Sequence, residues 1–365
     1  MKGGIARTGL ASAHSLGPAR LARLDGLRGV AAVGVVLHHI FFYFASWPLA
    51  QPPPFHFADW FEHSGWTLVD LFFLLSGYVF AHVYLSGEGP RHWRDFGDFW
   101  IARFARLYPL HVVTLVLCAI IMADNPENTA RAFLAHLLML QSFIVTPARS
   151  FDGPSWSLSV EVACYMIFVL SCMAGRRVLL IVTAALILWP IWRIATQGDP
   201  GGPWIDDMLR RGMLGFFLGQ AMWHWRYWLI RIPSPVLIIV MLTGFWLQSG
   251  NYSPLLPLSL LAWPAVLLLG LRSAAFEHPV MVWLGDRSYA IYLINFPLIL
   301  KAASLVHPRA FGTVQVLGWQ IGLLVAVLLL SDASYRWLEV PSRGEIRRVR
   351  ARARARTGLA GPVVG

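Results

Sequence analysis

Long apolar runs recur along almost the whole chain, and they decide what it can fold into. Runs of about 17 to 25 apolar residues, bounded by proline, glycine or charged residues, are the signature of membrane-spanning helices. Of the 365 residues, 57% are hydrophobic and 13% are charged, whereas a soluble domain carries about a quarter charged residues. This pattern excludes a soluble globular fold, and the high hydrophobicity also excludes a disordered chain.

The apolar runs predict an all-α fold, a polytopic membrane bundle of about ten transmembrane helices. The expected spans are 29–47, 66–86, 107–123, 157–173, 178–197, 208–228, 235–249, 255–271, 283–300 and 314–337. One further apolar stretch, 132–146, is short for a complete crossing.

Basic residues indicate the orientation of these spans, because cytoplasmic loops carry an excess of Lys and Arg. If 132–146 does not cross the membrane, both termini, Arg176, Arg177 and the C-terminal arginines fall on the cytoplasmic side. If it crosses, these residues fall outside, against the charge bias. We therefore expect 132–146 to be re-entrant or interfacial. The net charge of +11 is then a consequence of topology, and we expect no nucleic-acid partner.

This topology divides the chain into three parts. Residues 1–23 lack the apolar core of a signal peptide and are expected to form a cytoplasmic N-terminal segment. Residues 24–343 are expected to form the transmembrane domain. The arginine-rich residues 344–365 are expected to form a disordered cytoplasmic tail near anionic lipid.

Ionisable side chains inside apolar spans are candidates for function, because they are costly to place in lipid. In the first span, RLDGLRGVAAVGVVLHHIFFYF, eleven positions separate Arg28 from His39. That spacing puts them on one helix face, about 16 Å apart along the axis. Arg28 would lie at the cytoplasmic mouth and His39 near the midplane, where a neutral imidazole can act as a general base. His38 points elsewhere, and we expect it to donate to a carbonyl of a neighbouring helix.

Two carboxylates, Asp70 in GWTLVDLFFLLSGYVF and Glu161 in PSWSLSVEVACYMIF, are expected near the level of His39, in the outer half of their spans. For Asp70, a catalytic role and a structural pairing with an arginine of a neighbouring helix are equally open. Glu161 is favoured as functional because polar and aromatic side chains surround it and suit a polar acceptor. The members of this expected substrate-binding wall are Ser155, Trp156, Ser157 and Ser159.

Arg103 and Arg106, in RHWRDFGDFWIARFARLYPLH, are predicted to share a helix face at the cytoplasmic mouth of the third span. Ordinary flanking of a span by positive charge explains them equally well. The more specific interpretation is a phosphate-bearing ligand, because arginine forks bind phosphate oxygens in pairs.

Taken in order, the motifs of this chain resemble those of the acyltransferase 3 family, from about Leu24 to Arg343. They read LDGLRGVAAVGVVLHH, VDLFFLLSGYVF, FWIARFARLYPLH, PSWSLSVEVACYMIF, LGDRSYAIYLINFPL and YRWLEVPSR. The resemblance implies a multi-spanning O-acyltransferase of the bacterial inner (plasma) membrane that modifies surface polysaccharides or other carbohydrates. The spacing of Arg28 and His39 matches the arrangement that the family uses for activity.

The resemblance also implies the donor and the path of the acceptor. The donor would be a cytoplasmic acyl-CoA, with an acetyl group expected, whose phosphates contact Arg28, Arg103 and Arg106. The acceptor would reach His39 from the outer side, past Asp70 and Glu161. We expect no permanently bound cofactor and no metal ion.

The chain departs from the family in two respects. We expect no extracytoplasmic hydrolase-like domain of the kind that some relatives carry. Asn295, in INFP, also stands where the family commonly has a histidine. A role for Asn295 in proton transfer is therefore doubtful, but a hydrogen-bonding role at the substrate remains.

Three hypotheses follow. The first is O-acyl transfer from acyl-CoA to a carbohydrate hydroxyl, with His39 either deprotonating the hydroxyl or carrying the acyl group transiently. The alternative is a membrane transporter of an acyl group or lipid-linked sugar without covalent chemistry, which the absence of a recognisable internal repeat disfavours. The third is a non-catalytic membrane subunit whose buried polar residues satisfy one another.

Overall fold

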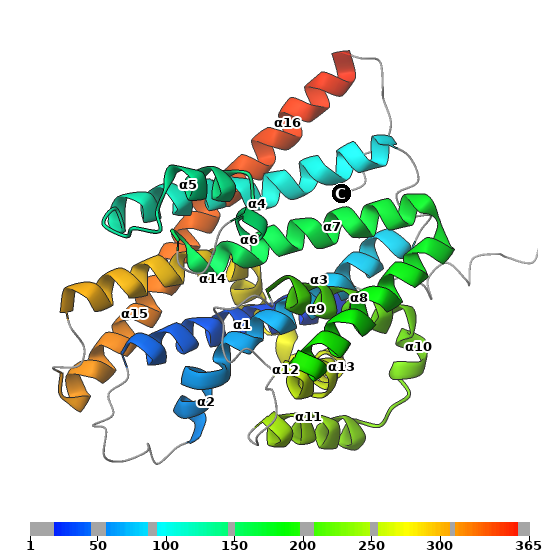
Figure 1. Cartoon of the computed structure of the whole chain (residues 1–365), viewed down its shortest axis with the longest axis horizontal. Helices are drawn as coiled ribbons and strands as arrows, with labels where there is room; N and C mark the ends of the chain where they lie inside the picture. The colour runs from blue at the N-terminus through cyan, green and yellow to red at the C-terminus, as the bar shows by residue number, and fades with distance from the viewer. Residues whose placement is uncertain are drawn as a thin grey trace, which may run out of the picture. The chain divides into compact units, whose positions relative to one another are not determined.

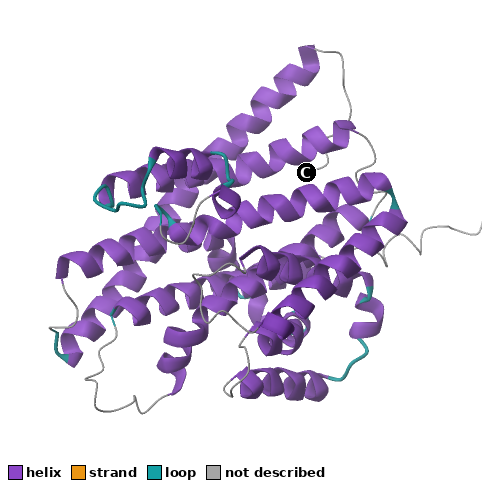
Figure 2. Ribbon diagram, viewed as in Figure 1, coloured by secondary structure: helices purple, strands orange, loops and turns teal. Residues whose placement is uncertain are grey.

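The structure is a computed structural model that describes residues 18–44, 56–86, 93–144, 150–197, 208–248, 255–306 and 311–356. Within these ranges the regular secondary structure is helical and no strand occurs (Figures 1 and 2). The predicted all-α membrane bundle is therefore confirmed.

Every expected span coincides with a helix. In chain order these helices are α1 (Pro18–Tyr43), α3 (Leu68–Leu85), α4 (Trp93–Ile121), α7 (Trp156–Ala174), α8 (Arg176–Gln197), α9 (Met208–His224), α11 (Ser234–Gln248), the run of α12 (Leu255–Pro257), η4 (Leu258–Ala262) and α13 (Trp263–Gly270), α14 (Pro279–Val306) and α15 (Thr313–Ser334). Among the described residues, 7 helical segments are long and apolar enough to cross a membrane, and two more, Ser234–Leu247 and Leu255–Gly270, are apolar but shorter.

Shorter elements connect these helices. They are α2 (His56–Ser64), η1 (Gly65–Thr67), α5 (Ala130–Leu137), α6 (Gln141–Ile144), η3 (Gly153–Ser155), α10 (Arg226–Leu229) and η5 (Ala274–Glu277). The ambiguous stretch 132–146 thus contains α5 and α6, separated at Met139, whose φ of 55° is left-handed. Through residue 144 no single helix of spanning length forms, as expected for a re-entrant or interfacial segment; residues 145 and 146 lie outside the described part.

The C-terminal tail corrects one expectation. Helix α15 continues through the π-helical turn η7 (Tyr335–Glu339) into α16 (Val340–Arg356), so residues 344–356 are helical and not disordered. Arginine and alanine are strong helix formers, and a segment that extends an existing helix avoids the cost of nucleation. Residues 357–365 lie outside the described ranges. At the other end, α1 begins at Pro18, and residues 1–17 are likewise outside.

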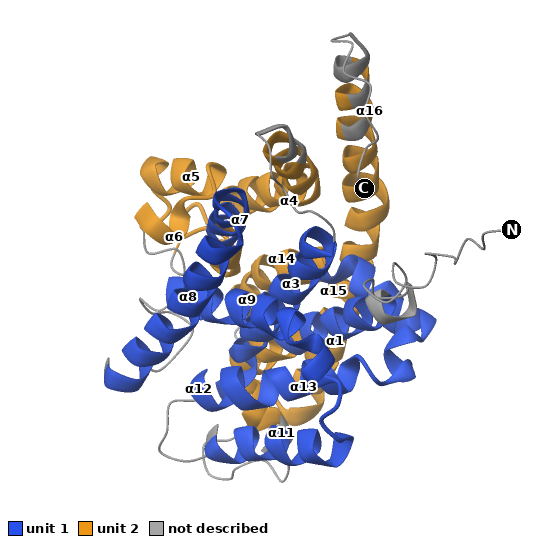
Figure 3. Cartoon of the chain, turned by 90° about the vertical axis from the view of Figure 1, so that its right-hand side faces the viewer, with its two compact units in different colours: residues 1–35, 63–91, 160–288 blue, residues 36–62, 92–159, 289–365 orange. Residues whose placement is uncertain are grey.

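The chain divides into two compact units (Figure 3). The first comprises residues 1–35, 63–91 and 160–288, and the second comprises residues 36–62, 92–159 and 289–365. Helices α1, α2, α7 and α14 contribute residues to both units. The two units are described separately below.

In the first unit, α3 and α9 approach each other closely because glycines line their interface. A Cβ atom at Gly77 would overlap the backbone of Phe216, and one at Gly219 would overlap the backbone of Leu74. Small residues at such positions let helix backbones pack together where lipid provides no hydrophobic driving force. This packing fixes the relative positions of the polar side chains that α3 and α9 carry.

In the second unit, α4 is the central helix, and α5, η7 and α16 pack against it. Its C-terminal half forms a small apolar core of Leu115 and Cys118 with Ala132 and Phe151. Its N-terminal half carries the arginines that the sequence singled out.

Candidate active site

Asn295 holds His39 in one orientation. Both side chains are buried, His39 in α1 and Asn295 in α14. The amide nitrogen of Asn295 donates to the carbonyls of Ile291 and Tyr292, at 2.8 and 2.7 Å, so the amide oxygen faces the imidazole. This oxygen can only accept a hydrogen bond, and it lies 2.5 Å from Nδ1 of His39. Nδ1 therefore carries the proton, and Nε2 of the neutral imidazole keeps its lone pair.

Asn295 thus contacts the predicted base. The sequence suggested a hydrogen bond from this position to the substrate, whereas the structure directs both ends of the amide to protein groups. The ring of Phe296 packs edge-on against His39, with 5.3 Å between ring centroids, and completes the support of the imidazole. His38 behaves as expected: its Nδ1 donates to the carbonyl of Phe61 at 2.8 Å.

Helix α14 also anchors the segment that contains the predicted substrate-binding wall. One turn before Asn295, the hydroxyl of Tyr292 donates to the carbonyl of Pro154 at 2.7 Å. The helix that orients His39 therefore holds the start of α7 as well. Both contacts lie within the second unit.

The wall residues themselves are buried and largely engaged with protein groups. The Ser157 hydroxyl donates to the carbonyl of Pro154 at 3.2 Å. The Ser159 hydroxyl accepts from the backbone N–H of Ser142 at 3.3 Å, and the carbonyl of Trp156 accepts from the Ser142 hydroxyl at 2.9 Å. In the structure these side chains tie α6 to α7.

A buried polar cluster lies next to this segment, and sequence reasoning missed it. His136 of α5 is at its centre: its Nε2 lies 3.1 Å from the hydroxyl of Ser150 and its Nδ1 lies 3.2 Å from that of Ser155. Its backbone carbonyl accepts from Nε2 of His111 in α4 at 2.7 Å. Gln141 donates to the carbonyl of Ser155 at 2.7 Å. The signal that could have found it is the pair of histidines in otherwise apolar segments.

Asp152 is the member of this region whose buried carboxyl group has the least hydrogen bonding. It is 1% exposed, and among the described residues neither carboxylate oxygen makes a hydrogen bond of regular geometry. Burial raises the pKa of Asp152 to about 8, and Thr114 of α4 offsets part of that rise. Asp152 is therefore a carboxylic acid, and not a carboxylate, over much of the neutral range.

Glu161, in the first unit, is held as a hydrogen-bond acceptor. Its Oε1 accepts from the hydroxyl of Ser76 in α3 at 2.9 Å and from the hydroxyl of Tyr165, one turn further along α7. Tyr165 is itself fixed by stacking on Phe80, with ring centroids 4.0 Å apart. Among the described residues no basic side chain pairs with Glu161, so its second oxygen is available to accept from a ligand.

Asp70 has a different environment, in which it pairs with an arginine of a neighbouring helix. Its carboxylate accepts two hydrogen bonds from Arg211 of α9, at 3.1 and 2.9 Å. The two side chains are 2% and 3% exposed, and the guanidinium lies 4.4 Å from the ring centroid of Trp66. Breaking such a buried pair on one side costs about 3 to 5 kcal/mol. Arg211 was not predicted, because its partner is 141 positions away.

Arg28 lies on α1 with His39, as the spacing predicted, and one unbroken helix carries both. Arg28 is half-buried and pairs with Asp25 at 2.9 Å, within the first turns of α1. Arg103 and Arg106 are both half-buried on α4.

The predicted residues are distributed over both units. Arg28, Asp70 and Glu161 belong to the first. The members in the second unit are His39, Arg103, Arg106, Trp156, Ser157, Ser159 and Asn295. In the described ranges, no group of His, Cys, Asp or Glu side chains could hold a metal ion.

Comparisons with known proteins identify the family of the chain. The sequence signature of the acyltransferase 3 family, described as an acyltransferase domain, matches residues 21–336. The chain is 28% identical to the acyltransferase MdmB of Streptomyces mycarofaciens, over 88% of this chain and 91% of that protein. It is 26% identical to a putative peptidoglycan O-acetyltransferase, YrhL of Bacillus subtilis, and 25% identical to the peptidoglycan O-acetyltransferase OatA of Listeria monocytogenes.

These two matches cover 88% of this chain, which spans 54% and 55% of the two relatives, about half of their length. No solved structure matches the chain significantly. The family signature spans the described helices from α1 to α15, and an acyltransferase domain of this extent contradicts the transporter and non-catalytic alternatives. The chain belongs to the acyltransferase 3 family and is a multi-pass membrane acyltransferase.

Proposed function

We propose that this acyltransferase moves an acyl group, with acetyl expected, from cytoplasmic acyl-CoA to a hydroxyl of a cell-envelope carbohydrate. The acceptor class is a surface polysaccharide, a glycolipid or an exopolysaccharide precursor. Because two relatives are named peptidoglycan O-acetyltransferases, a cell-wall glycan is the first acceptor to try. The protein would lie in the bacterial inner membrane with both termini in the cytoplasm, as the distribution of arginines favours.

The tautomer of His39 carries this proposal. Nδ1–H is committed to Asn295, so Nε2 can take a proton from the acceptor hydroxyl. The hydroxyl oxygen then attacks the thioester carbonyl, the C–S bond breaks, and the thiolate of CoA takes the proton back from the imidazolium. The ester and free CoA are the products, and His39 returns to its neutral form.

A covalent variant uses the same nitrogen. Nε2 would attack the thioester carbonyl first, the C–S bond would break, and the CoA thiolate would leave an acyl-imidazole on His39. The acceptor hydroxyl would then attack the acyl carbonyl, the C–N bond would break, and the hydroxyl proton would pass to the CoA thiolate. In both routes the amide of Asn295 keeps the imidazole in place but does not supply charge. Arg28, Arg103 and Arg106 would bind the phosphates of the donor, and Glu161 would accept a hydrogen bond from the acceptor.

Transfer of label tests the proposal. The purified full chain, reconstituted in liposomes, is incubated with radiolabelled acetyl-CoA and a cell-wall glycan fraction. His39→Ala should lower transfer by a factor of about 10² to 10⁴, the usual contribution of a general base. His38→Ala serves as the neighbouring control, and thermal unfolding checks that both variants are folded.

The proposal is wrong if His39→Ala transfers label as well as the wild-type protein. Quenching the wild-type reaction in the absence of acceptor separates the two routes, because label bound to the protein appears only if an acyl-imidazole forms.

A further inference from the structure

Helix α10 and the residues beside it form an exposed aromatic segment, 225–231. Its large side chains are 46% to 64% exposed; they are Trp225, Tyr227, Trp228 and Ile230. Arginines alternate with them at positions 226 and 231. Tryptophan and tyrosine are enriched at the membrane–water interface, where a ring can meet both lipid and water. Segment 225–231 therefore has the composition of an interfacial segment.

The ends of three helices lie beside this segment. Helix α8 begins at Arg176 and packs against α9, which ends at His224. Arg176 and Arg226 both lie within electrostatic range of His224. Arg226 also lies within range of His82, near the end of α3. These residues all belong to the first unit, and together with segment 225–231 they form one surface, the α10 surface.

Two aromatic rings hold the side chain of Arg226 in place. Its guanidinium lies 3.9 Å from the ring centroid of Trp223 and 4.3 Å from that of Tyr227. Nη1 donates to the carbonyl of Trp223 at 2.9 Å, and Nη2 donates to the hydroxyl of Tyr227 at 3.1 Å. A guanidinium has five N–H donors, so Arg226 keeps donors for a ligand. A fixed guanidinium of this kind suits the paired oxygens of a phosphate group.

Two more arginines extend the α10 surface. The guanidinium of Arg231 lies 5.0 Å from the ring centroid of Trp228. Arg272, which follows α13, donates to the carbonyls of Leu229 and Ile230 at 3.4 and 3.2 Å. Arg272 thereby ties the end of α13 to the exposed aromatic segment, so that positive charge from several elements gathers at one place.

Arginines outnumber carboxylates on the α10 surface. The arginines are Arg176, Arg177, Arg226, Arg231 and Arg272, and none of them pairs with a carboxylate among the described residues. Between Glu161 and Glu277 the described part of the chain contains no Asp or Glu. Asp199, Asp206 and Asp207 fall in the connection 198–207, outside the described ranges, which joins the opposite ends of α8 and α9.

The described carboxylates of the first unit lie elsewhere. They are Asp25 on α1, Asp70 at the start of α3, Glu161 at the start of α7, Glu277 in η5 and Asp286 on α14. Three of them pair with arginines outside the α10 surface, namely Arg28, Arg211 and Arg23. Glu88 follows α3 outside the described ranges and would supply one carboxylate against five arginines. Anions from outside the chain are therefore needed to offset the repulsion among these arginines.

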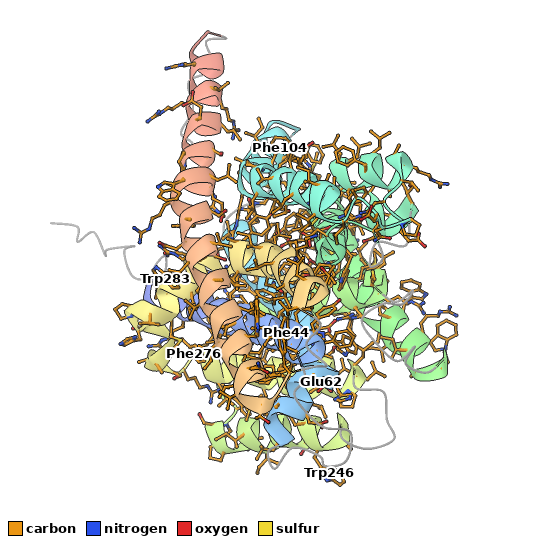
Figure 4. All side chains as sticks on the ribbon, turned by 90° about the vertical axis from the view of Figure 1, so that its left-hand side faces the viewer. Phe44, Glu62, Phe104, Trp246, Phe276 and Trp283 are labelled. Atoms are coloured by element: carbon orange, nitrogen blue, oxygen red, sulfur yellow. The ribbon has the colours of Figure 1, made fainter. Side chains whose placement is uncertain are left out.

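Helix α11 indicates where such anions come from. It begins just after Arg231, and near its other end Trp246 is 72% exposed and is labelled at the lower margin of Figure 4. Tryptophans at the two ends of an apolar helix mark the two interfaces of a membrane. Trp228 and its neighbours then lie at the level of the lipid headgroups, where the phosphate groups are those of phospholipids.

We propose that the α10 surface binds the phosphate group of an anionic phospholipid, with Arg176 and Arg226 contacting the phosphate and Trp228 lying among the headgroups. A zwitterionic headgroup adds an ammonium group that the arginines repel, so a headgroup with net negative charge fits better. The inference goes beyond the acyl transfer proposed above and does not depend on it.

Binding of single lipids to the purified full chain in a neutral detergent tests this site. Native mass spectrometry over a range of lipid concentrations gives the Kd for phosphatidylglycerol and for phosphatidylcholine with the same acyl chains. The wild-type chain should bind phosphatidylglycerol more tightly. Arg226→Gln and Arg176→Gln should each raise the Kd for phosphatidylglycerol about fivefold, the effect of one basic side chain at an anionic surface, and leave the Kd for phosphatidylcholine within about twofold.

The matched control is Arg131→Gln, which removes the same charge from an exposed position on α5 in the second unit. It should leave both Kd values within about twofold. Arg176→Gln is decisive if Arg226→Gln fails to fold, because the exposed Arg176 makes no hydrogen bond among the described residues.

Three results would overturn the inference. Equal losses for Arg131→Gln and Arg226→Gln would mean that net charge alone matters. Equal affinities of the wild-type chain for the two lipids would mean that the surface does not select an anionic headgroup. Displacement of phosphatidylglycerol by inorganic phosphate or CoA at equal concentration would assign the arginines to a soluble phosphate compound and not to lipid.

Discussion

The amide oxygen of Asn295 accepts the Nδ1 proton of His39 across 2.5 Å, and the amide nitrogen is anchored to the backbone of its own helix. The amide cannot rotate without losing three hydrogen bonds, so it selects one tautomer of the imidazole. The Asn295 amide fixes the orientation of His39 without adding a charge. This is sufficient for a general base, because His39 must release the proton that it takes up in every catalytic cycle.

Asn295→Leu should therefore lower kcat while leaving the KM for acetyl-CoA nearly unchanged. The leucine has a similar volume but offers no acceptor, so Nδ1–H loses its partner and the ring can adopt the other tautomer. We expect a loss of kcat of at least about tenfold. Steady-state kinetics with radiolabelled acetyl-CoA measure it, and an unchanged kcat would contradict a positioning role.

Glu161→Gln should affect the acceptor and not the donor. Its side chain keeps an oxygen for Ser76 and Tyr165 but loses its charge, which weakens a hydrogen bond to a substrate hydroxyl. The kcat/KM for the acceptor should fall about 10- to 100-fold, with the KM for acetyl-CoA unchanged. Tyr165→Phe, which frees the carboxylate but keeps its charge, should give a smaller loss. A rise in the KM for acetyl-CoA would place Glu161 on the donor side instead.

Asp70→Asn should lower the free energy of unfolding. It leaves the buried guanidinium of Arg211 without a counter-charge, which costs about 3 to 5 kcal/mol of the free energy of unfolding. The double variant Asp70→Leu with Arg211→Met removes both charges and should recover most of that loss. Unfolding in detergent, measured beside acetyl transfer, is the test. If the double variant is stable but inactive, the pair contributes to activity as well.

Asp152 predicts a pH dependence of stability. Its pKa is about 8 in the folded protein against an ordinary value of 3.8, so the folded state holds a proton that the unfolded chain releases. The stabilising contribution is full below about pH 4, declines as pH rises, and is lost above about pH 8. Thr114 and Cys118 of α4 are the groups that interact with this carboxyl.

Asp152→Asn should remove this dependence, because the amide does not titrate. Thermal unfolding at pH 5.5 and pH 8.5 should show a larger loss for the wild-type protein than for the variant, by on the order of a few kcal/mol. Equal losses would mean that the Asp152 carboxyl is not titrating in the buried cluster.

The helices and their order could be read from the sequence because lipid imposes a length and a composition on each span. The common helix of Arg28 and His39 was also predictable, since helical periodicity alone fixes their spacing. The partners of these residues were not. Whether Asp70 meets Arg211, or His39 meets Asn295, depends on which helices pack together, and local sequence does not encode that.

Two further features escaped prediction for different reasons. The buried cluster around His136 joins segments whose only common signal is a histidine in an apolar context. Helix α16 was taken for a disordered tail because its charge is high, although its alanines and arginines favour helix and the preceding span provides a helix end to extend.

Helices α15, η7 and α16 follow one another without a break from Thr313 to Arg356. α16 extends about 25 Å beyond η7, so a change in the tilt of α15 displaces the far end of α16 like the end of a rigid arm. The tilt of a spanning helix follows the thickness of the bilayer around it. Lipid composition would thus affect the position of the arginines of α16 through the tilt of α15, and bilayers of different acyl-chain length should not be interchangeable in assays of this protein.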